Sequence, residues 1–259
     1  MRTFYRTDGD LHVPTELTRG PWTDVHQHGG PPCALLGRAI EAALATPSHR
    51  VVRVTVELRR PIALAPLRAV ARSIELGRTV QRLAATLEQG DHEVARATAL
   101  AVHVAAIEIP ALAADPPPPL PDGLAPFALP LFPDRVGYDK AMDLRIARGT
   151  WGAGPVAAWL RMRVPLVDDE PPSPLVRVLC AADSGNGVSP VLDPARFTFL
   201  NADLTVNVFR PPSGEWIGLD AVSSAMPSGL GLADARLFDE QGPIGRATQS
   251  LVVRSVERP

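Results

Sequence analysis

The sequence contains an internal repeat, and this limits the possible fold more than any other feature. Residues 51–103 align with residues 201–253 without a gap. The alignment pairs "VTVELRRP" (residues 54–61) with "LTVNVFRP" (residues 204–211), and an "RAT" run stands at the same place in both copies. Because the register never shifts, we interpret the two segments as copies of one structural unit.

Each copy is predicted to contain one helix followed by four strands. Residues 28–46 carry apolar side chains at helical spacing, after glycines and a proline that suit a helix start. Alternating β-branched runs predict strands near residues 50–59, 67–76, 80–88 and 93–104. The second copy repeats this pattern, with a helix near 173–184 and strands near 199–209, 215–224, 230–238 and 243–254. Strand-like residues also precede each helix, around 4–13 and 142–166.

A proline-rich segment separates the two copies. Residues 116–119 are four consecutive prolines, which neither a helix interior nor a central strand accommodates. The segment is therefore predicted to be an extended, semi-rigid connector. We expect an N-terminal domain at residues 1–107, a linker at 108–134, and a C-terminal domain at 135–259 that carries the candidate catalytic residues.

Composition excludes several classes of function. The net charge is −2 and the isoelectric point is near 6.3, whereas a nucleic-acid or anionic-membrane surface needs clustered basic residues. No apolar run is long enough to span a membrane, and the first residues lack the apolar core of a secretory signal. The only cysteines are Cys33 and Cys180, so we expect a cytoplasmic protein with reduced thiols.

Four motifs carry a resemblance to a known family. They are "HGGPPCALLGRAIE" (28–41), "AADSGNG" (181–187), "NADLTVNVFRPPSGEWIGLDA" (201–221) and "GLADARLFDEQGPIGRATQSL" (231–251). The chain resembles acyl-CoA thioesterases of the thioesterase II type, in the thioesterase-like superfamily. The resemblance implies an α+β double hotdog fold, in which each of two tandem units wraps an antiparallel β-sheet around a central helix. It also implies an acyl-CoA substrate and no cofactor.

The resemblance implies three catalytic residues that hold the hydrolytic water: Asp203, Ser224 and Gln249. The neighbouring Ser223 is an alternative for the hydroxyl residue. The repeat supports this choice independently, because the corresponding positions of the first copy hold Arg53, Ile74 and Ala99. The three candidate groups, a carboxylate, a hydroxyl and an amide, occur at these positions only in the second copy, as expected if one active site has been kept and the other lost.

The start of the first helix is the second part of the expected site. In paired hotdog units the helix start of one half meets the carboxylate of the other half, so His28, Gly29 and Gly30 are expected to bind substrate. Unpaired backbone N–H groups there would stabilise the oxyanion, while Asp203 accepts a proton from the attacking water. This mechanism needs no covalent acyl-enzyme.

Other functions and sites remain open at this stage. Asp24, His26 and His28 lie close in sequence, but a third or fourth ligand at a convincing spacing is missing, so we predict no metal site. An enoyl-CoA hydratase would use an Asp and a His beside the central helix, for which Asp24 and His28 are the candidates. A non-hydrolytic acyl-thioester binding protein is the third possibility. A homodimer of double units is plausible, and the sequence leaves acyl chain length open.

Overall fold

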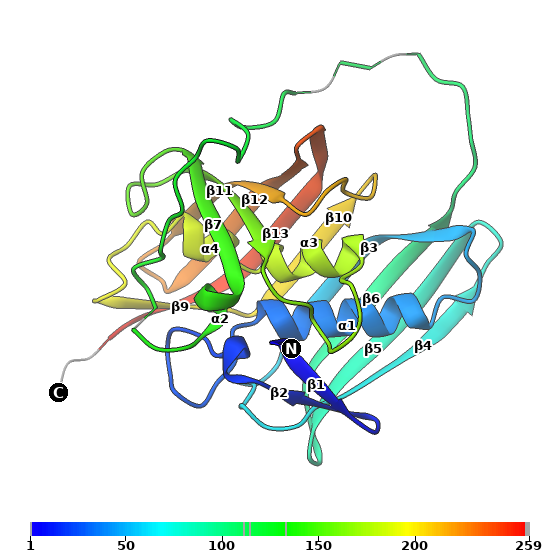
Figure 1. The fold of residues 1–259 in the computed structure, drawn as a ribbon, viewed down its shortest axis with the longest axis horizontal. Coiled ribbons are helices and arrows are strands. Elements are labelled where there is room, and N and C mark those ends of the chain that lie inside the picture. The colour runs from blue at the N-terminus through cyan, green and yellow to red at the C-terminus, as the bar shows by residue number, and fades with distance from the viewer. Residues whose placement is uncertain (1, 111, 114, 133, 257–259) are drawn as a thin grey trace.

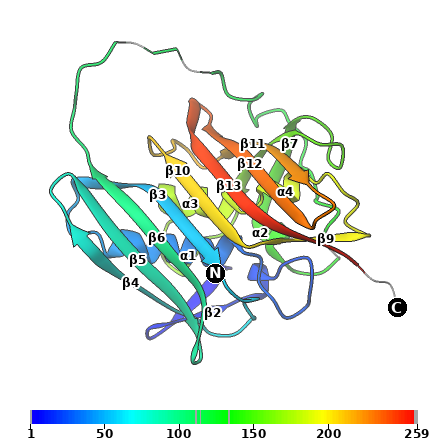
Figure 2. The same ribbon diagram turned by 180° about the vertical axis from the view of Figure 1, so that it is seen from behind.

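The computed structural model describes residues 2–110, 112–113, 115–132 and 134–256 (Figure 1). Within these residues eleven strands form one antiparallel sheet, in the order β4-β5-β6-β3-β10-β13-β12-β11-β8-β7, and β9 pairs with β13. The sheet passes from one half of the chain to the other without interruption, as the rear view shows (Figure 2). The prediction of a mainly antiparallel sheet with few helices is confirmed.

The first half contains one long helix and two groups of strands. Its elements are β1 (Tyr5–Asp8), β2 (Leu11–Pro14), the 3-10 helix η1 (Glu16–Thr18), α1 (Gly30–Ala42), β3 (His49–Leu58), β4 (Arg68–Leu76), β5 (Val80–Gln89) and β6 (His92–His103). The strand-like residues before α1 form a separate two-stranded hairpin. The hairpin lies against the large sheet through one bridge, between His12 and Leu67.

The second half repeats this plan with more breaks. Its elements are α2 (Tyr138–Ala141), β7 (Met142–Arg148), β8 (Val156–Met162), α3 (Pro174–Ala182), α4 (Gly185–Val188), β9 (Phe197–Asn201), β10 (Asp203–Val208), β11 (Ile217–Ala225), β12 (Leu230–Asp239) and β13 (Gly242–Ser255). The helix predicted at 173–184 stops at Ala182. Two glycines in the short α4 lower its helix propensity, and Asp183 is drawn into side-chain hydrogen bonds.

The two copies of the repeat meet at the antiparallel pairing of β3 with β10. Thr55 stands directly opposite Thr205, and the two hydroxyls are hydrogen bonded at 3.2 Å. These residues occupy equivalent positions of the repeat, 150 residues apart. The pairing is therefore symmetric about this point, and an approximate two-fold axis relates the strand β3 to β10.

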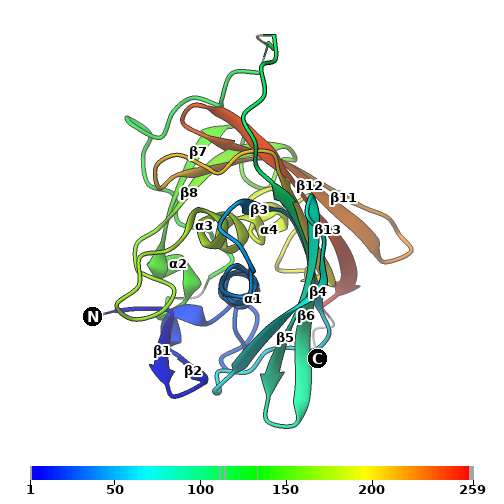
Figure 3. The ribbon, with the colours of Figure 1, turned by 90° about the vertical axis from the view of Figure 1, so that its right-hand side faces the viewer.

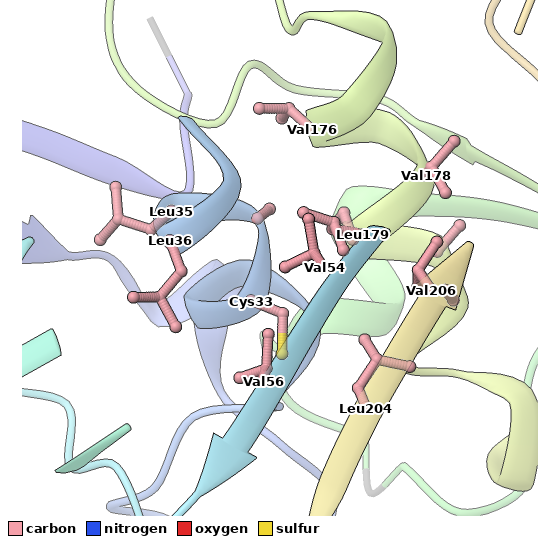
Figure 4. Close-up of a cluster of buried hydrophobic side chains, with 14 of the residues drawn as sticks. Cys33, Leu35, Leu36, Val54, Val56, Val176, Val178, Leu179, Leu204 and Val206 are labelled. Atoms are coloured by element: carbon pink, nitrogen blue, oxygen red, sulfur yellow. The ribbon is translucent and has the colours of Figure 1, made fainter. Parts of the chain in front are cut away.

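The sheet curves around α1 and α3, which pack side by side (Figure 3). Gly37 lies at their contact, and a Cβ atom there would collide with the side chain of Leu179. Gly37 therefore leaves room for the Leu179 side chain between the two helices. Around them, buried side chains from both helices and from β3 and β10 form one continuous core (Figure 4). This core joins the halves and fixes the position of the α1 start.

The described part of residues 108–134 contains no helix or strand. The chain leaves β6 in a wide arc, visible in green in Figure 1. It then lies against the second half, where Trp159 Nε1 donates to Pro119 O at 2.7 Å and Phe127 N donates to Leu144 O at 2.8 Å. No helix among the described residues is long and apolar enough to cross a bilayer.

Candidate active site

His28 lies where the two halves of the chain meet, just before α1 begins. Its Nδ1 is 3.2 Å from Asp183 Oδ2, and only 15% of its side chain is exposed. The ring stacks on Tyr138, with 3.9 Å between the ring centroids and 2° between the planes. Burial lowers the pKa of His28 below its ordinary value, and the Asp183 carboxylate opposes this only in part. The imidazole is therefore neutral at pH 7.

Asp183 is the carboxylate at this junction. It caps the C-terminal end of α3, and its side chain is 2% exposed. Its Oδ1 accepts a hydrogen bond from Asn201 Nδ2 at 2.8 Å and a longer one from Gln249 Nε2 at 3.4 Å. A buried carboxylate is tolerated only when donors surround it, and these two amides supply that surrounding. Asp183 thus connects His28 of the first half to two residues of the second half.

Gln249 is buried and fully engaged in hydrogen bonds. It is 2% exposed, its Nε2 donates to Asp183 O at 3.0 Å, and its Oε1 accepts from Asn186 N at 3.2 Å. Asn186 lies in the first turn of α4, so Gln249 also satisfies a donor at that helix start. The side-chain Oδ1 of Asn186 is buried and has no partner in the described structure. An acceptor is therefore free next to Gln249.

The glycines before α1 allow the two halves to touch. A Cβ atom on Gly29 would lie 2.8 and 2.9 Å from the two Asp183 oxygens, and one on Gly30 would lie 2.6 Å from Cys180 O. Gly30 N donates to His28 Nδ1 at 3.0 Å. Within the described residues, Gly29 N has no hydrogen-bond acceptor. The helix start therefore offers one unpaired donor close to the carboxylate.

Asp203 lies elsewhere on the sheet. It is the first residue of β10, opposite Glu57 of β3, and its Oδ1 accepts from Ser250 N at 2.6 Å. Side chains alternate along a strand, and the next residue, Leu204, points into the core. Asp203 therefore lies on the outer face and Gln249 on the inner face. The structure does not bring these two side chains together.

The same alternation separates Ser224 from Gln249. Ser224 stands opposite Leu232 on the exposed face of β11 and β12. Ser223 stands opposite Ala233, which in turn stands opposite Gln249, so these three side chains form one row on the inner face. Ser223 is 4% exposed, and its hydroxyl lies 2.9 Å from Ser189 Oγ. Of the two serines, Ser223 is the one on the side of Gln249.

A cavity of about 420 Å³ opens onto the junction. His28, Gly29, Asp183 and Asn201 form its polar inner wall. The rest of the lining is mixed, and consists of Gly20, Pro21, Trp22, Thr23, His26, Gln27, Leu58, Arg59, Arg60, Pro61, Ile62, Phe199 and Leu200. The start of the first helix and polar groups of the second half thus face one space that a ligand can enter.

The remaining candidates take no part in this site. Asp24 is 78% exposed and pairs with Arg135 at the surface, so it does not partner His28. Among residues 2–110, 112–113, 115–132 and 134–256, no three His, Cys, Asp or Glu side chains are grouped as metal ligands. The prediction of no metal site stays a prediction.

The sequence does not predict the contacts of Asp183 with His28, Asn201 and Gln249. The motif that contains Asp183, "AADSGNG", was recognised, but the residue itself fell inside a predicted helix. An acidic residue at the end of an apolar helical segment, directly before a Ser-Gly-Asn-Gly run, was the available signal. It indicates a helix end with a buried carboxylate, although only the fold shows what that carboxylate contacts.

Solved structures with the same fold include proteins from two mycobacteria. Acyl-CoA thioesterase II TesB2 from Mycobacterium marinum is 18% identical, with a TM-score of 0.67 over 96% of this chain and 95% of that one. The tesB protein of Mycobacterium avium subspecies paratuberculosis is 17% identical, with a TM-score of 0.69 over 94% and 92%. A conserved protein of unknown function with a hot dog fold, from Alicyclobacillus acidocaldarius, is 16% identical, with a TM-score of 0.72 over 97% and 96%. These likenesses show a hotdog fold.

Two family models match adjacent parts of the sequence. The acyl-CoA thioesterase N-terminal domain matches residues 18–102, and the acyl-CoA thioesterase C-terminal domain matches residues 111–253. No curated protein matches the sequence significantly. Because the two matches occur in the order of the repeat and the second alone covers more than half of the chain, this chain belongs to the acyl-CoA thioesterase family, a family of thioester hydrolases.

Proposed function

We propose that this protein hydrolyses an acyl-CoA thioester to a free acid and CoA by direct attack of a water molecule in the cavity at the junction. One observation carries the proposal. Asp183 of the second half contacts His28 and Gly29 of the first half, and Gln249 and Asn201 hold its other oxygen. The group that can activate water and the helix start that can stabilise an oxyanion therefore share one cavity.

In this proposal Asp183 accepts the proton of the attacking water. The family resemblance assigns that role to Asp203, but the Asp203 carboxylate accepts from Ser250 N and lies on the outer face. Asp183 lies in the cavity wall, where amide donors fix its orientation. A positioned carboxylate within reach of substrate is what general-base catalysis requires. Gln249 and Asn201 are positioning residues, since they act through Asp183.

The oxyanion is stabilised at the start of α1. When water attacks, negative charge develops on the thioester oxygen, and a preorganised N–H donor lowers the energy of that state. Gly29 N is unpaired within the described residues and lies at the positive end of the helix dipole. Pro31 and Pro32 follow in the first turn and have no N–H, so Gly29 supplies this donor.

The two thiols are poor nucleophiles. Cys33 and Cys180 are completely buried, and burial raises the pKa of both well above the ordinary thiol value. Each therefore remains protonated at neutral pH. This supports attack by water rather than formation of an acyl-cysteine intermediate.

The finer description of the fold belongs to the same proposal. Each half is a hotdog unit, with α1 as the central helix of the first and α3 as that of the second. The equivalent strand orders β4-β5-β6-β3 and β11-β12-β13-β10 support this division. The boundaries are then residues 1–107, 108–134 and 135–259. Further dimerisation of this double unit stays a prediction.

The test is free-thiol release from a panel of acyl-CoA esters that runs from short to long chains and includes aromatic acids. The proposal predicts hydrolysis of at least one ester, and the panel gives the preferred chain at once. Absence of thiol release across the panel would contradict the proposal. If the protein then binds a non-hydrolysable acyl-CoA, it is a binding protein.

One contact favours an enoyl-CoA hydratase as the second candidate. His28 Nδ1 and Asp183 Oδ2 lie 3.2 Å apart beside the start of α1, which is the Asp and His arrangement a hydratase would use. An enoyl-CoA substrate separates the two reactions. Hydration consumes the double bond and leaves the thioester intact, whereas hydrolysis releases CoA thiol and keeps the double bond.

A further inference from the structure

Two consecutive arginines and a tryptophan form the outer part of the cavity wall. Arg59 and Arg60 follow β3 directly, and their backbone N–H groups donate to Val94 O at 3.0 and 3.2 Å. Trp22 lines the same cavity and is 41% exposed. The sheet thus fixes the backbone of this loop, while the charged and aromatic side chains remain accessible at the entrance.

The entrance carries positive charge that the protein does not neutralise. Arg59 Nη1 donates to Glu93 Oε1 at 2.7 Å, but the same oxygen also accepts from Arg96 Nε at 2.7 Å. In the part of the chain that the structure describes, Arg60 has no ion pair and no side-chain hydrogen bond. Asp183 is the one acidic residue among the lining residues described, and it is engaged at the inner wall.

In the second copy of the repeat, the arginine equivalent to Arg60 is neutralised by an acidic residue. Arg60 corresponds to Arg210 of the second copy, which donates two hydrogen bonds to Asp239, at 2.5 and 2.7 Å. Asp239 is completely buried and corresponds to Gln89 of the first copy. Gln89 donates to backbone oxygens of the 63–65 segment instead. The copy that borders the cavity therefore keeps the arginine but lacks the acid that would neutralise it.

From this asymmetry we infer that Arg60, together with Arg59 and Trp22, binds the nucleotide end of CoA. The guanidinium groups bind phosphate oxygens, for which their planar donors are well suited, and the indole stacks on the adenine. The inference rests on the proposed function, because it places the thioester end of the same molecule at Gly29 and Asp183. It specifies CoA, rather than a thioester lacking the nucleotide, as the preferred substrate.

The experiment compares an acyl-CoA that the protein hydrolyses with the same acyl group on pantetheine, which lacks the nucleotide. Arg60→Gln is expected to raise KM for the acyl-CoA about tenfold, with kcat within about twofold, because the lost contact is equally strong in ground and transition states. KM for the acyl-pantetheine stays unchanged. The control is Arg72→Gln on β4, an exposed arginine that also has no ion pair within the described residues; this variant changes neither substrate's KM.

Equal KM values of the wild type for the two substrates, or an unchanged KM in Arg60→Gln, would overturn the inference. Calorimetric titration with CoA provides a readout that does not depend on turnover. If the wild type hydrolyses neither substrate, the proposed function fails. Weaker CoA binding by Arg60→Gln than by Arg72→Gln would still support the inference in that case, and equal binding would reject it.

Discussion

Gly29 is the residue whose missing side chain leaves room for the Asp183 carboxylate in the candidate site. A methyl group there would lie 2.8 and 2.9 Å from the Asp183 oxygens. The carboxylate has little freedom to move away, because Asn201 Nδ2 holds Oδ1 at 2.8 Å and His28 lies against Oδ2. The geometry of the candidate site therefore depends on the absence of a side chain at position 29.

Gly29→Ala is expected to lower kcat/KM by about tenfold or more, since small misplacements of a catalytic group cost large factors in rate. Gly187→Ala in α4 is the matched control, because its new Cβ meets only Leu131 Cδ1, at 3.9 Å. That variant should keep wild-type kcat/KM. Thermal unfolding by circular dichroism checks that both variants fold. Unchanged kcat/KM in folded Gly29→Ala would show that the contact with Asp183 is not needed.

The sequence predicts the surroundings of some candidate residues and not of others, for a physical reason. Strand parity alone predicts that Gln249 faces an apolar interior and must find partners, and it is buried and hydrogen bonded. The surroundings of Asp203 and Ser224 depend on which face of the sheet each side chain takes near the end of its strand. That face is set by the pairing register of the strands and by the break between β9 and β10. Asp183 becomes a candidate only when α1 of the other half lies beside it.

At the scale of elements, an ion pair joins the end of β12 to the loop between β10 and β11. Asp239 ends β12, is completely buried, and accepts from Arg210 and from the backbone N–H groups of Ser213 and Gln241, at 2.7 and 2.9 Å. Burial alone would raise the pKa of Asp239, but these hydrogen bonds outweigh it and lower the pKa below its usual value. The pair therefore stabilises the folded state while Asp239 is ionised.

Asp239→Asn is expected to lower the free energy of unfolding at pH 7 by about 3 kcal/mol, the low end for a broken buried pair, because Arg210 is 30% exposed. Asp234→Asn on the same strand removes an exposed pair with Arg246 and should cost about 0.5 kcal/mol. The pKa of Asp239 is lower in the folded state than in the unfolded state. The ion pair therefore contributes its full stabilisation at pH values above the ordinary carboxyl pKa. This stabilisation is lost as the pH falls through the lowered pKa of the folded state.

Urea unfolding of the wild type, Asp239→Asn and Asp234→Asn, at neutral and at acidic pH, measures the free energy of unfolding of each protein. The gap between wild type and Asp239→Asn should narrow as the solution is acidified. A gap that stays constant with pH, or equal losses in the two variants, would mean that Asp239 does not hold the loop as described.

The elements themselves were the most predictable part of the structure. Alternation and turn residues predicted strands close to those observed, since side-chain period and turn chemistry are local properties. The break between α3 and α4 was not predicted, because the hydrogen bonds that replace the helix at Asp183 come from distant residues. The separate β1–β2 hairpin likewise depends on contacts outside its own sequence.

At the scale of the whole molecule, both copies of the repeat contribute residues to the candidate site. β3 and β10 join the copies symmetrically at Thr55 and Thr205, and this places the start of α1 against the end of α3. The first copy contributes the helix start and the basic entrance, and the second contributes the buried carboxylate and its amide donors. The repeat predicts a site shared by the two halves, which stays a prediction, and only the assembled sheet shows which residues of the two halves lie together.

The central claim is that Asp183, held at the junction, is the carboxylate that activates water. It is tested most directly by kcat for the best acyl-CoA in Asp183→Asn and Asp203→Asn. The two variants make the same chemical change, one at the end of α3 and the other on the outer face of β10. We expect Asp183→Asn to lower kcat by about 100-fold or more, and Asp203→Asn to keep kcat within about threefold, with both proteins folded. Loss of activity in Asp203→Asn with wild-type turnover in Asp183→Asn would contradict the account.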